Sequence, residues 1–573
     1  MINNRDVARV LETIADLLEI KGEVIYKILA YRRAAESILE LGQDISQVYQ
    51  RGELTAIPGV GDAISEKIIE LIETGSLEFL ERLEQDVPPT LIDLLDVPGL
   101  GPKRVQLFWQ KLGISDLEEL QEAAQQGRLS SLEGIGPKTE ANILTGIQAL
   151  QQRSDRIPLG EAWPFAQELL RYLEDLDEVS TASPAGSLRR MRETVGDLDL
   201  LAAAEDPQPV MAAFVKHPRV SEIVSQGSIK SSVVFDNGLR AQLWVHPPAR
   251  FGTALQYATG AQDHNVRLRE LALQKGYSLS EHAMLRTSDQ TEIPFANEED
   301  LYQALDLPWI PPELREDRGE IQAAQEDRLP GLISRDQIIS ELHSHSTWSD
   351  GQYAIREMVQ AARSRGLRVL AVTDHSQSLG IAGGISPEEL LQQREEISQI
   401  QQELIGEMTI LAGIELEILA DGQLDFPDEV LAELDLVIAS LHTSTRQPRE
   451  KVTTRMLEAI HNPHVDIIAH PTNRLIGKRE PADLDMDAVL QAAAETSTAL
   501  EINANPQRLD LADIYVRRAL ELGVLITINT DAHSPTDFDY LKFGIATARR
   551  GWASADQVIN TWAPSRLSGW LKR

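Results

Sequence analysis

The sequence has no cysteine, no long apolar run and an ordinary share of charged residues. Without cysteine the chain forms no disulfide bond and no thiolate metal site, so histidine and carboxylate side chains remain as the metal ligands. A membrane-spanning helix needs about 20 consecutive apolar residues, and because no stretch comes near that length we expect no membrane partner. The N-terminal stretch MINNRDVARVLETIADLLEI places acids inside an amphipathic pattern, unlike a signal peptide, so we expect a cytoplasmic protein.

Positive charge is scarce as well. The chain holds 54 Lys and Arg residues against 89 Asp and Glu residues, which gives a formal net charge of −35. Such a balance argues against a broad basic surface for nucleic acid, so a DNA partner would have to be held by backbone amides, bound cations or local basic clusters. With 573 residues the chain exceeds one hydrophobic core, and several domains are expected.

One short pattern occurs three times in the helical first 150 residues: AIPGVGDAISEKI, DVPGLGPKRVQLF and LEGIGPKTEANI. A Gly-x-Gly turn that opens a helix exposes backbone N–H groups to a phosphate, although a single such turn is often only a tight link between helices. Three copies predict helix-hairpin-helix elements that contact the DNA backbone without reading sequence. The predicted DNA-binding residues are Gly59, Gly61, Gly99, Gly101, Gly134 and Gly136.

The stretch VGDLDLLAAA places Asp197 and Asp199 on the same face of a predicted strand. Two acids facing one way indicate a site for a divalent cation, which usually requires a third acidic ligand. Taken alone, an Asp-x-Asp pair is more often a solvated strand end.

Two neighbouring motifs give the acid pair its context. AGSLRRMRETVGDLDLL and YATGAQDHNVRLRELALQKGY follow in order and resemble the catalytic core of family X DNA polymerases. The resemblance implies that Asp197 and Asp199 are catalytic and hold Mg²⁺ or Mn²⁺, and that DNA and dNTP are partners. It implies nucleotide-binding roles for Gly186, Ser187, Arg190, Tyr257, Asn265 and Arg269.

The sequence departs from that pattern at the third acid. The following strand reads LRAQLWVHP, and Gln242 stands where the family has aspartate; Asp236 is near but lies in a turn, off the strand register. A neutral amide binds Mg²⁺ more weakly and cannot take a proton, so we expect a weakened or inactive polymerase core.

The N-terminal stretches AYRRAAESILEL and IPGVGDAISEKIIELIETGSLEFLERL resemble the small lyase domain of the same family. In relatives with deoxyribose-phosphate lyase activity a lysine after the hairpin forms a Schiff base, and Lys67 occupies that position. The alternative is an ordinary solvated lysine on an amphipathic helix.

From about residue 336 the pattern changes to seven β-like runs separated by helical stretches, most of them ending in His, Asp, Glu or Asn. Parallel α/β barrels place their chemistry at the carboxyl ends of strands, so these residues predict a barrel with a metal-binding mouth. The predicted ligands are His343, His345, Asp350, His375, Glu415, His442, His470, Asp531 and His533.

These motifs resemble the PHP (polymerase and histidinol phosphatase) domain, a distorted seven-stranded barrel with up to three metal ions. By that resemblance His343, His345, Glu415 and Asp531 hold one ion, Glu415 with His442 and His470 a second, and Asp350, His375 and His533 a third. Imidazole mixed with carboxylate suits Mn²⁺ or Zn²⁺, and clustered metals favour phosphoester hydrolysis. Asn503 and Arg474 are candidate supporting residues, whereas His461 and His464 are expected at the surface.

The whole chain therefore resembles bacterial and archaeal family X polymerases with a C-terminal PHP domain. We expect a multidomain protein: a lyase-like helical domain (1–85), a fingers-like domain with two hairpins (86–154), an α+β palm (155–250) and thumb (251–310), a linker (311–335) and an α/β PHP barrel (336–573). The resemblance implies gap-filling base excision repair and a 3′–5′ exonuclease. Two alternatives stay open: a non-catalytic polymerase-like module that delivers DNA ends, or a small-molecule phosphatase with a regulatory N-terminal part.

Overall fold

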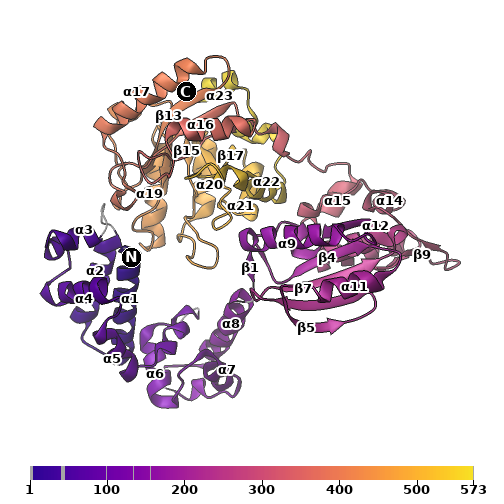
Figure 1. Ribbon diagram of the computed structural model, residues 1–573, viewed down its shortest axis with the longest axis horizontal. Coiled ribbons are helices and arrows are strands. Elements are labelled where there is room, and N and C mark those ends of the chain that lie inside the picture. The colour runs from indigo at the N-terminus through magenta and orange to yellow at the C-terminus, as the bar shows by residue number, and fades with distance from the viewer. Residues whose placement is uncertain (1–3, 40–44, 98–99, 133, 155, 572–573) are drawn as a thin grey trace. The chain divides into compact units, whose positions relative to one another are not determined.

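The computed structural model describes residues 4–39, 45–97, 100–132, 134–154 and 156–571, and the chain divides into two compact units (Figure 1). One unit comprises Met1–Asp155 with Gln377–Gly384, and the other comprises Arg156–Ser376 with Ile385–Arg573. Among the described residues, no helix combines the length and the apolar composition needed to cross a membrane.

The first unit contains helices without a β-sheet over its described residues. Apolar residues three or four positions apart in the first helix, such as Leu11, Ile14 and Leu18, are fully buried in a core shared by all the hairpins. The α-helices are α1 (Asn4–Lys21), α2 (Ile25–Leu39), α3 (Ile45–Gln50), α4 (Asp62–Thr74), α5 (Glu78–Asp86), α6 (Pro102–Leu112), α7 (Leu117–Gln125) and α8 (Pro137–Ser154). The predicted helix-hairpin-helix organisation is confirmed.

The second unit begins with a five-stranded sheet of order β2-β4-β7-β6-β5, in which only β4 and β7 run parallel. Alternate residues of β4 (Leu198, Leu200 and Ala202) share a core with two helices on one face, while Leu201 contacts a third helix on the other. The elements are β1 (Ile157–Pro158), α9 (Leu159–Glu174), β2 (Thr181–Pro184), α10 (Gly186–Arg189), β3 (Thr194–Val195), β4 (Leu198–Ala203), α11 (Pro207–Val215), β5 (Val220–Gln226), β6 (Lys230–Phe235) and β7 (Arg240–His246).

A helical region with a small antiparallel sheet follows. Its elements are α12 (Phe251–Thr259), α13 (Gln262–Gln274), β8 (Tyr277–Leu279), β9 (Met284–Arg286), β10 (Glu292–Ile293), α14 (Glu298–Ala304) and α15 (Glu320–Gln325). The stretch 311–335, expected as a linker, carries α15 and buries Arg315 completely. Because the Arg315 guanidinium donates to both oxygens of buried Glu298, this stretch is packed into the region that precedes it.

Seven parallel strands then form one sheet in sequence order, β11 to β17, with helices around it (Figure 1). An isolated parallel bridge between Ser344 and Ala532 joins the chain just after the first and last strands, so the sheet is a nearly closed barrel, as predicted. The elements are β11 (Ser340–Glu341), α16 (Ile355–Ser364), β12 (Val369–Val372), α17 (Pro387–Glu403), β13 (Thr409–Glu417), α18 (Asp428–Leu431), β14 (Leu436–Ser440), α19 (Arg449–His461), β15 (Ile467–Ile468), α20 (Met486–Thr496), β16 (Ala499–Asn503), α21 (Asp513–Glu521), β17 (Ile526–Asn529), α22 (Leu541–Arg550) and α23 (Pro564–Leu571).

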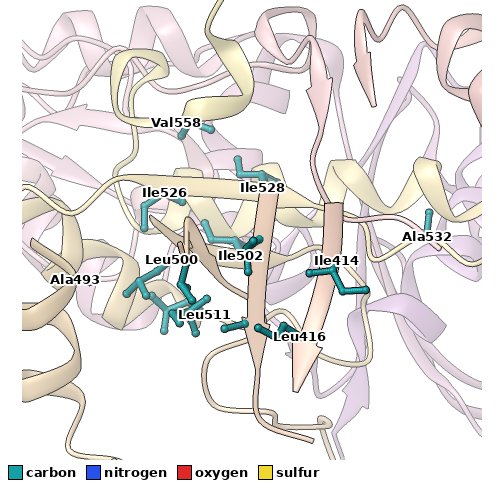
Figure 2. Packing of buried hydrophobic residues seen from close by; sticks show 14 of the residues in the cluster. Ile414, Leu416, Ala493, Leu500, Ile502, Leu511, Ile526, Ile528, Ala532 and Val558 are labelled. Atoms are coloured by element: carbon teal, nitrogen blue, oxygen red, sulfur yellow. The ribbon is translucent and has the colours of Figure 1, made fainter. Parts of the chain in front are cut away.

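Both faces of the barrel strands are apolar, as in parallel sheets that are covered on two sides. Ile502 and Ile528 belong to the cluster between strands and helices that Figure 2 shows from close by. Val369 and Ile438 belong instead to a second cluster, which also receives Trp562 from the C-terminal segment. These two clusters hold the strands rigidly, so the residues that follow each strand are fixed in space.

Candidate functional site

The nine predicted metal ligands converge at the carboxyl ends of the barrel strands. Glu415 lies on β13, and the other eight residues lie in the segments that follow β11, β12, β14, β15 and β17. In a parallel barrel these ends meet at one rim, and this topology brings together residues nearly 200 positions apart.

Glu415 is the centre of the cluster and is almost fully buried. Its Oε2 lies 2.8 Å from His375 Nδ1 and 3.4 Å from His343 Nε2. Its Oε1 lies 2.9 Å from His470 Nε2 and 3.4 Å from His442 Nε2. The two oxygens thus face different histidines, which suits a carboxylate that bridges two cations.

Two further carboxylates complete the cluster. Asp531 Oδ1 lies 3.0 Å from His345 Nε2 and 3.5 Å from His343 Nε2. Asp350 Oδ1 lies 3.2 Å from His533 Nε2 and 3.5 Å from His375 Nε2. Three overlapping sets have ligand atoms close enough to share an ion: His345 with Asp350, His375 and His533; His343 with His345 and Glu415; and His375 with Glu415 and His442.

Several of these atoms are buried and make no hydrogen bond of good geometry, even where an oppositely charged atom lies close. They are His343 Nε2, both ring nitrogens of His345, His375 Nδ1, Glu415 Oε2 and His470 Nδ1. A buried polar atom without a hydrogen bond is unfavourable by about 1–3 kcal/mol, so this concentration in one cluster favours a further ligand. Imidazole nitrogens and carboxylate oxygens are ligands for divalent metals, and the residues present therefore fit a metal centre.

The electrostatics of the cluster keep its acids ionised. Burial opposes ionisation of Glu415 and Asp531, but the neighbouring histidines hold the pKa of both carboxyl groups well below the usual range. His533 shows the reciprocal effect, since burial is outweighed by the hydrogen bond to Asp350 and the pKa of the ring rises to about 9. His470 differs, because burial and then Arg508 lower its pKa to about 4. The centre thus offers charged oxygens and a neutral His470 imidazole at neutral pH.

Two buried acids that sequence reasoning missed hold histidine rings in place. Glu501 Oε1 lies 2.8 Å from His343 Nδ1, and Glu417 Oε2 lies 3.0 Å from His442 Nδ1. Each ring therefore turns its Nε2 toward Glu415, an arrangement that selects the tautomer able to bind a metal. Their signal was weak: Glu417 and Glu501 each stand two residues from a predicted site residue on the same strand.

The two expected supporting residues differ. Asn503 Nδ2 donates to Asp531 Oδ2 over 3.0 Å, so this amide does orient a cluster carboxylate. Arg474 instead donates to Glu193 and to the carbonyl oxygens of Arg508 and Leu509. Arg508, absent from the predicted set, lies nearer, with Nε 3.9 Å from Asp531 Oδ2. His461 is exposed and His464 is half-buried.

The acid pair of the five-stranded sheet lies at the start of β4. The Cα of Gln242 on β7 pairs with that of Asp199, so the predicted register holds, and the Gln242 amide donates to Asp197. Asp236 is exposed and pairs with Arg219. Burial and the charge of Asp197 raise the pKa of Asp199 to about 7. Two close carboxylates with an amide side chain beside them form a candidate cation site.

Gly186 lies against this pair. Its φ is +54°, and a Cβ at this position would come within 2.0 Å of Asp199 Oδ2. Any side chain at position 186 would displace the Asp199 carboxylate, so the acid pair requires glycine here for steric reasons. The predicted phosphate contact of Gly186 is a separate role.

The other predicted nucleotide-binding residues differ in availability. Arg190 is buried, donating to Glu316 over 3.0 Å and to the Thr259 carbonyl over 2.6 Å. Asn265 is held by Gln256 and by the Tyr257 carbonyl. Ser187, Tyr257 and Arg269 are half-buried. Both Arg190 and Asn265 would have to exchange existing partners to contact a nucleotide.

The three hairpins of the first unit share one geometry. In each turn a hydrophobic residue donates its N–H three residues back: Val60 to Ile57, Leu100 to Val97 and Ile135 to Leu132, over 2.9–3.1 Å. Gly59 and Gly134 both have a φ above +80°, whereas Gly99 lies outside the described residues. Gly61 and Gly101 precede α4 and α6 with no side chain capping the helix, and Gly136 precedes α8. The first-turn N–H groups of α4 and α6 therefore have no side-chain cap.

Lys67 projects from α4 beside an aromatic pair. Its Nζ donates to the Ala63 carbonyl over 2.9 Å and lies 4.8 Å from the centroid of Phe79, which is stacked on Tyr31. Lys27 lies 5.8 Å from the same ring. The two amines therefore share one aromatic surface.

Comparison with known proteins gives matches over nearly all of the chain. Family models match a helix-hairpin-helix domain at residues 2–77, a SAM-like helix-hairpin-helix tandem at 91–149, a DNA polymerase beta thumb at 254–316 and a PHP domain at 341–505. The chain is 39% identical to the DNA polymerase/3′-5′ exonuclease PolX of Bacillus subtilis (strain 168), and the match covers 100% of both chains. It is 28% identical to DNA polymerase lambda of Rattus norvegicus over 55% of this chain and 56% of that protein. A probable phosphatase of Thermoanaerobacter sp. (strain X514) is 29% identical over 39% of this chain and 91% of its own length.

Proposed function

Because the chain belongs to the PolX family, we propose that it is a DNA repair enzyme whose barrel removes nucleotides from 3′ ends of gapped or nicked DNA. Its five-stranded sheet and thumb are homologous to polymerases, and here the polymerase reaction is slow or absent because Gln242 replaces an acid. The barrel carries the more complete chemistry of the two.

One observation carries the nuclease proposal: nine histidine and carboxylate side chains of the kind that binds metal meet at one rim, and several of their buried atoms make no hydrogen bond of good geometry. Manganese or zinc ions held there would supply a hydroxide near neutral pH and neutralise the charge of a phosphodiester. The chain itself orients this centre, since Glu501 and Glu417 hold the rings of His343 and His442.

The test uses DNA labelled at the 3′ nucleotide, with Mn²⁺ or Zn²⁺ added to the full chain. Asp531→Ala and His343→Ala should each abolish release of the label while thermal unfolding remains cooperative. His461→Ala, an exposed histidine at the end of α19, is the matched control and should leave the rate unchanged. Undiminished release of the label by the Asp531→Ala variant would show that the nuclease active site lies outside the barrel cluster.

A second candidate is favoured by Gln242, whose amide donates to Asp197: the sheet and thumb bind gapped DNA and deliver its ends without synthesis. The same labelled DNA with dNTPs separates the two candidates. Extension in Mn²⁺ but hardly in Mg²⁺ supports a weakened polymerase, whereas no extension with either ion supports delivery only. A small phosphate ester tested alongside distinguishes the phosphatase alternative, since rapid ester hydrolysis without DNA cleavage would contradict the nuclease.

DNA contact is proposed to use the backbone amides of the three hairpins. Few Lys or Arg residues would then neutralise phosphates, so binding should weaken less with salt than for a basic binder of equal affinity. Gly61→Pro removes one candidate N–H donor and should lower affinity for gapped DNA. A steep salt dependence together with unchanged affinity of this variant would exclude the mechanism.

Lyase activity at Lys67 is proposed from its position after the first hairpin. An abasic 5′ end should be trapped on the wild-type chain by borohydride, which reduces a Schiff base, and Lys67→Arg should prevent trapping because guanidinium forms no such adduct. Lys27→Arg, beside the same Phe79 ring, is the control. Trapping that depends on Lys27 instead would reassign the nucleophile.

A further inference from the structure

A small cavity lies in the second unit, and its lining includes neither the acid pair nor any of the nine predicted metal ligands of the barrel. Its volume is about 210 Å³, and it is bounded by the segment after α10 and by residues of α21 and α22. Ligand pockets usually measure about 300–1,000 Å³, so this cavity accepts a small ion or molecule and not a nucleotide. The charged residues that line it are Arg192, Glu193, Arg318, Arg474, Asp513 and Arg550.

The acids here are outnumbered by the arginines that they hold. Glu316, which adjoins the cavity, accepts hydrogen bonds from Arg190 Nε at 3.0 Å, Arg192 at 2.9 Å and Arg550 at 3.0 Å. A single oxygen of Asp513 accepts from Arg318 at 2.9 Å and from Arg550 at 2.8 Å.

This cluster of hydrogen bonds therefore joins two carboxylates, those of Glu316 and Asp513, to four guanidinium groups, and it carries a formal excess of two positive charges. The four arginines are Arg190, Arg192, Arg318 and Arg550. The pair of Arg474 with Glu193 is balanced and leaves that excess unchanged. This surplus contrasts with the formal net charge of −35 of the chain as a whole.

Part of this charge cluster is buried. The side chain of Arg550, which lines the cavity, is 5% exposed, and that of its partner Glu316 is 8% exposed. The charges of these two residues therefore stay in place, and an anion in the cavity would reduce the positive excess beside them.

Two of the arginines have donors left for such a counterion. The side chains of Arg192 and Arg318 are 40% and 32% exposed, and each uses one guanidinium nitrogen in its contact with a carboxylate among the described residues. A guanidinium group carries five N–H donors in a planar fork that matches the oxygens of a phosphate.

We propose that this cavity binds one small phosphate anion, inorganic phosphate or pyrophosphate. The site uses neither the acid pair nor the metal ligands of the barrel, so it goes beyond the proposed function and does not depend on it. The anion neutralises the excess charge between the sheet and the barrel and thereby stabilises this junction.

The experiment is calorimetric titration of the full chain with pyrophosphate, and separately with phosphate, at low salt in EDTA. Without divalent cations neither the acid pair nor the barrel can hold the anion through metal. We expect one binding site per chain. The anion that binds with the lower dissociation constant is the occupant that the site prefers.

The Arg192→Gln, Arg318→Gln double variant should bind about tenfold or more weakly, since each lost hydrogen bond to a charged group contributes about tenfold. The matched control is Arg356→Gln with Arg363→Gln, two partly exposed arginines on α16 that pair with Glu403 and Glu407. This control should retain the affinity of the wild type. If the double variant unfolds, Arg318→Lys keeps the charge but loses the fork and should bind with intermediate affinity.

Two results would overturn the proposal. They are the absence of saturable binding of either anion at millimolar concentration, and binding by the double variant that equals that of the wild type.

Discussion

Replacing Gln242 by aspartate would place a third carboxylate beside Asp197 and Asp199. The substitution is conservative in position, because the Cα of residue 242 already pairs with that of Asp199 on the neighbouring parallel strand. A general base contributes about 10²–10⁴-fold to a rate, equivalent to about 2.7–5.4 kcal/mol at 1.36 kcal/mol per tenfold. We therefore expect Gln242→Asp to accelerate Mg²⁺-dependent nucleotide insertion by about 10²–10⁴-fold.

The same change should lower stability when no divalent cation is present. Burial and Asp197 already raise the pKa of Asp199 to about 7, and a third carboxylate adds repulsion while removing the amide that donates to Asp197. The melting temperature of the variant should fall in EDTA and recover with Mg²⁺ more than that of the wild type does. This second readout separates a new cation ligand from a merely altered shape.

The assay is single-turnover insertion opposite a one-nucleotide gap, with Asp531→Ala also present to silence the barrel. Gln242→Asn is the matched control, because asparagine has the size of aspartate without its charge, and it should stay as slow as glutamine. Rapid Mg²⁺-dependent insertion by the unsubstituted chain, or equal acceleration by asparagine and aspartate, would refute the reasoning.

Three further outcomes are expected. Glu501→Gln should reduce metal affinity by about 10–100-fold in a chelator competition, because Glu501 orients the ring of His343. The control Glu495→Gln, on the exposed side of α20, should leave the affinity unchanged, and equal affinities of the two variants would show that the His343 ring needs no such partner. Gly186→Ala should abolish dNTP binding in a fluorescence titration, since the new Cβ would lie 2.0 Å from Asp199 Oδ2. The control Gly238→Ala, also at positive φ but in open space, should still bind dNTP, and equal losses in the two variants would mean that backbone strain alone explains the effect. Burial alone would raise the pKa of the Glu316 carboxyl group, but Arg550, Arg190 and Arg192 lower this pKa to about 2. Glu316→Gln should therefore destabilise the chain at pH 7 by about 3 kcal/mol in urea unfolding. Since that pKa is lower in the folded state than the ordinary 4.5, the wild-type advantage is complete above pH 4.5 and is lost as the pH falls toward 2; a difference that does not change with pH would contradict this origin.

The sequence alone predicted the structure wherever a short pattern of residues determines the backbone conformation. The Gly-x-Gly turns predicted the hairpins because Gly59 and Gly134 adopt a positive φ that other residues avoid. Alternating strands and helices predicted the barrel, whose topology brings the strand ends together, and the resemblance to the PHP domain paired residues as distant as His343 and Asp531, which lie 3.5 Å apart.

Only the tertiary structure decided which side chains meet inside that frame. Glu501 contacts His343 across 158 residues of sequence, and Arg550 contacts Glu316 across 234. Neither pair follows from a repeat or a motif, because each depends on how segments far apart in the sequence pack together in the folded chain. The stretch 311–335 illustrates the same point: its proline and charge predicted a linker, and only the structure shows that Arg315 is buried there, where Glu298 neutralises it. Backbone preference acts over a few residues and is written in the sequence, whereas the burial of a charge depends on a partner that only the folded chain supplies.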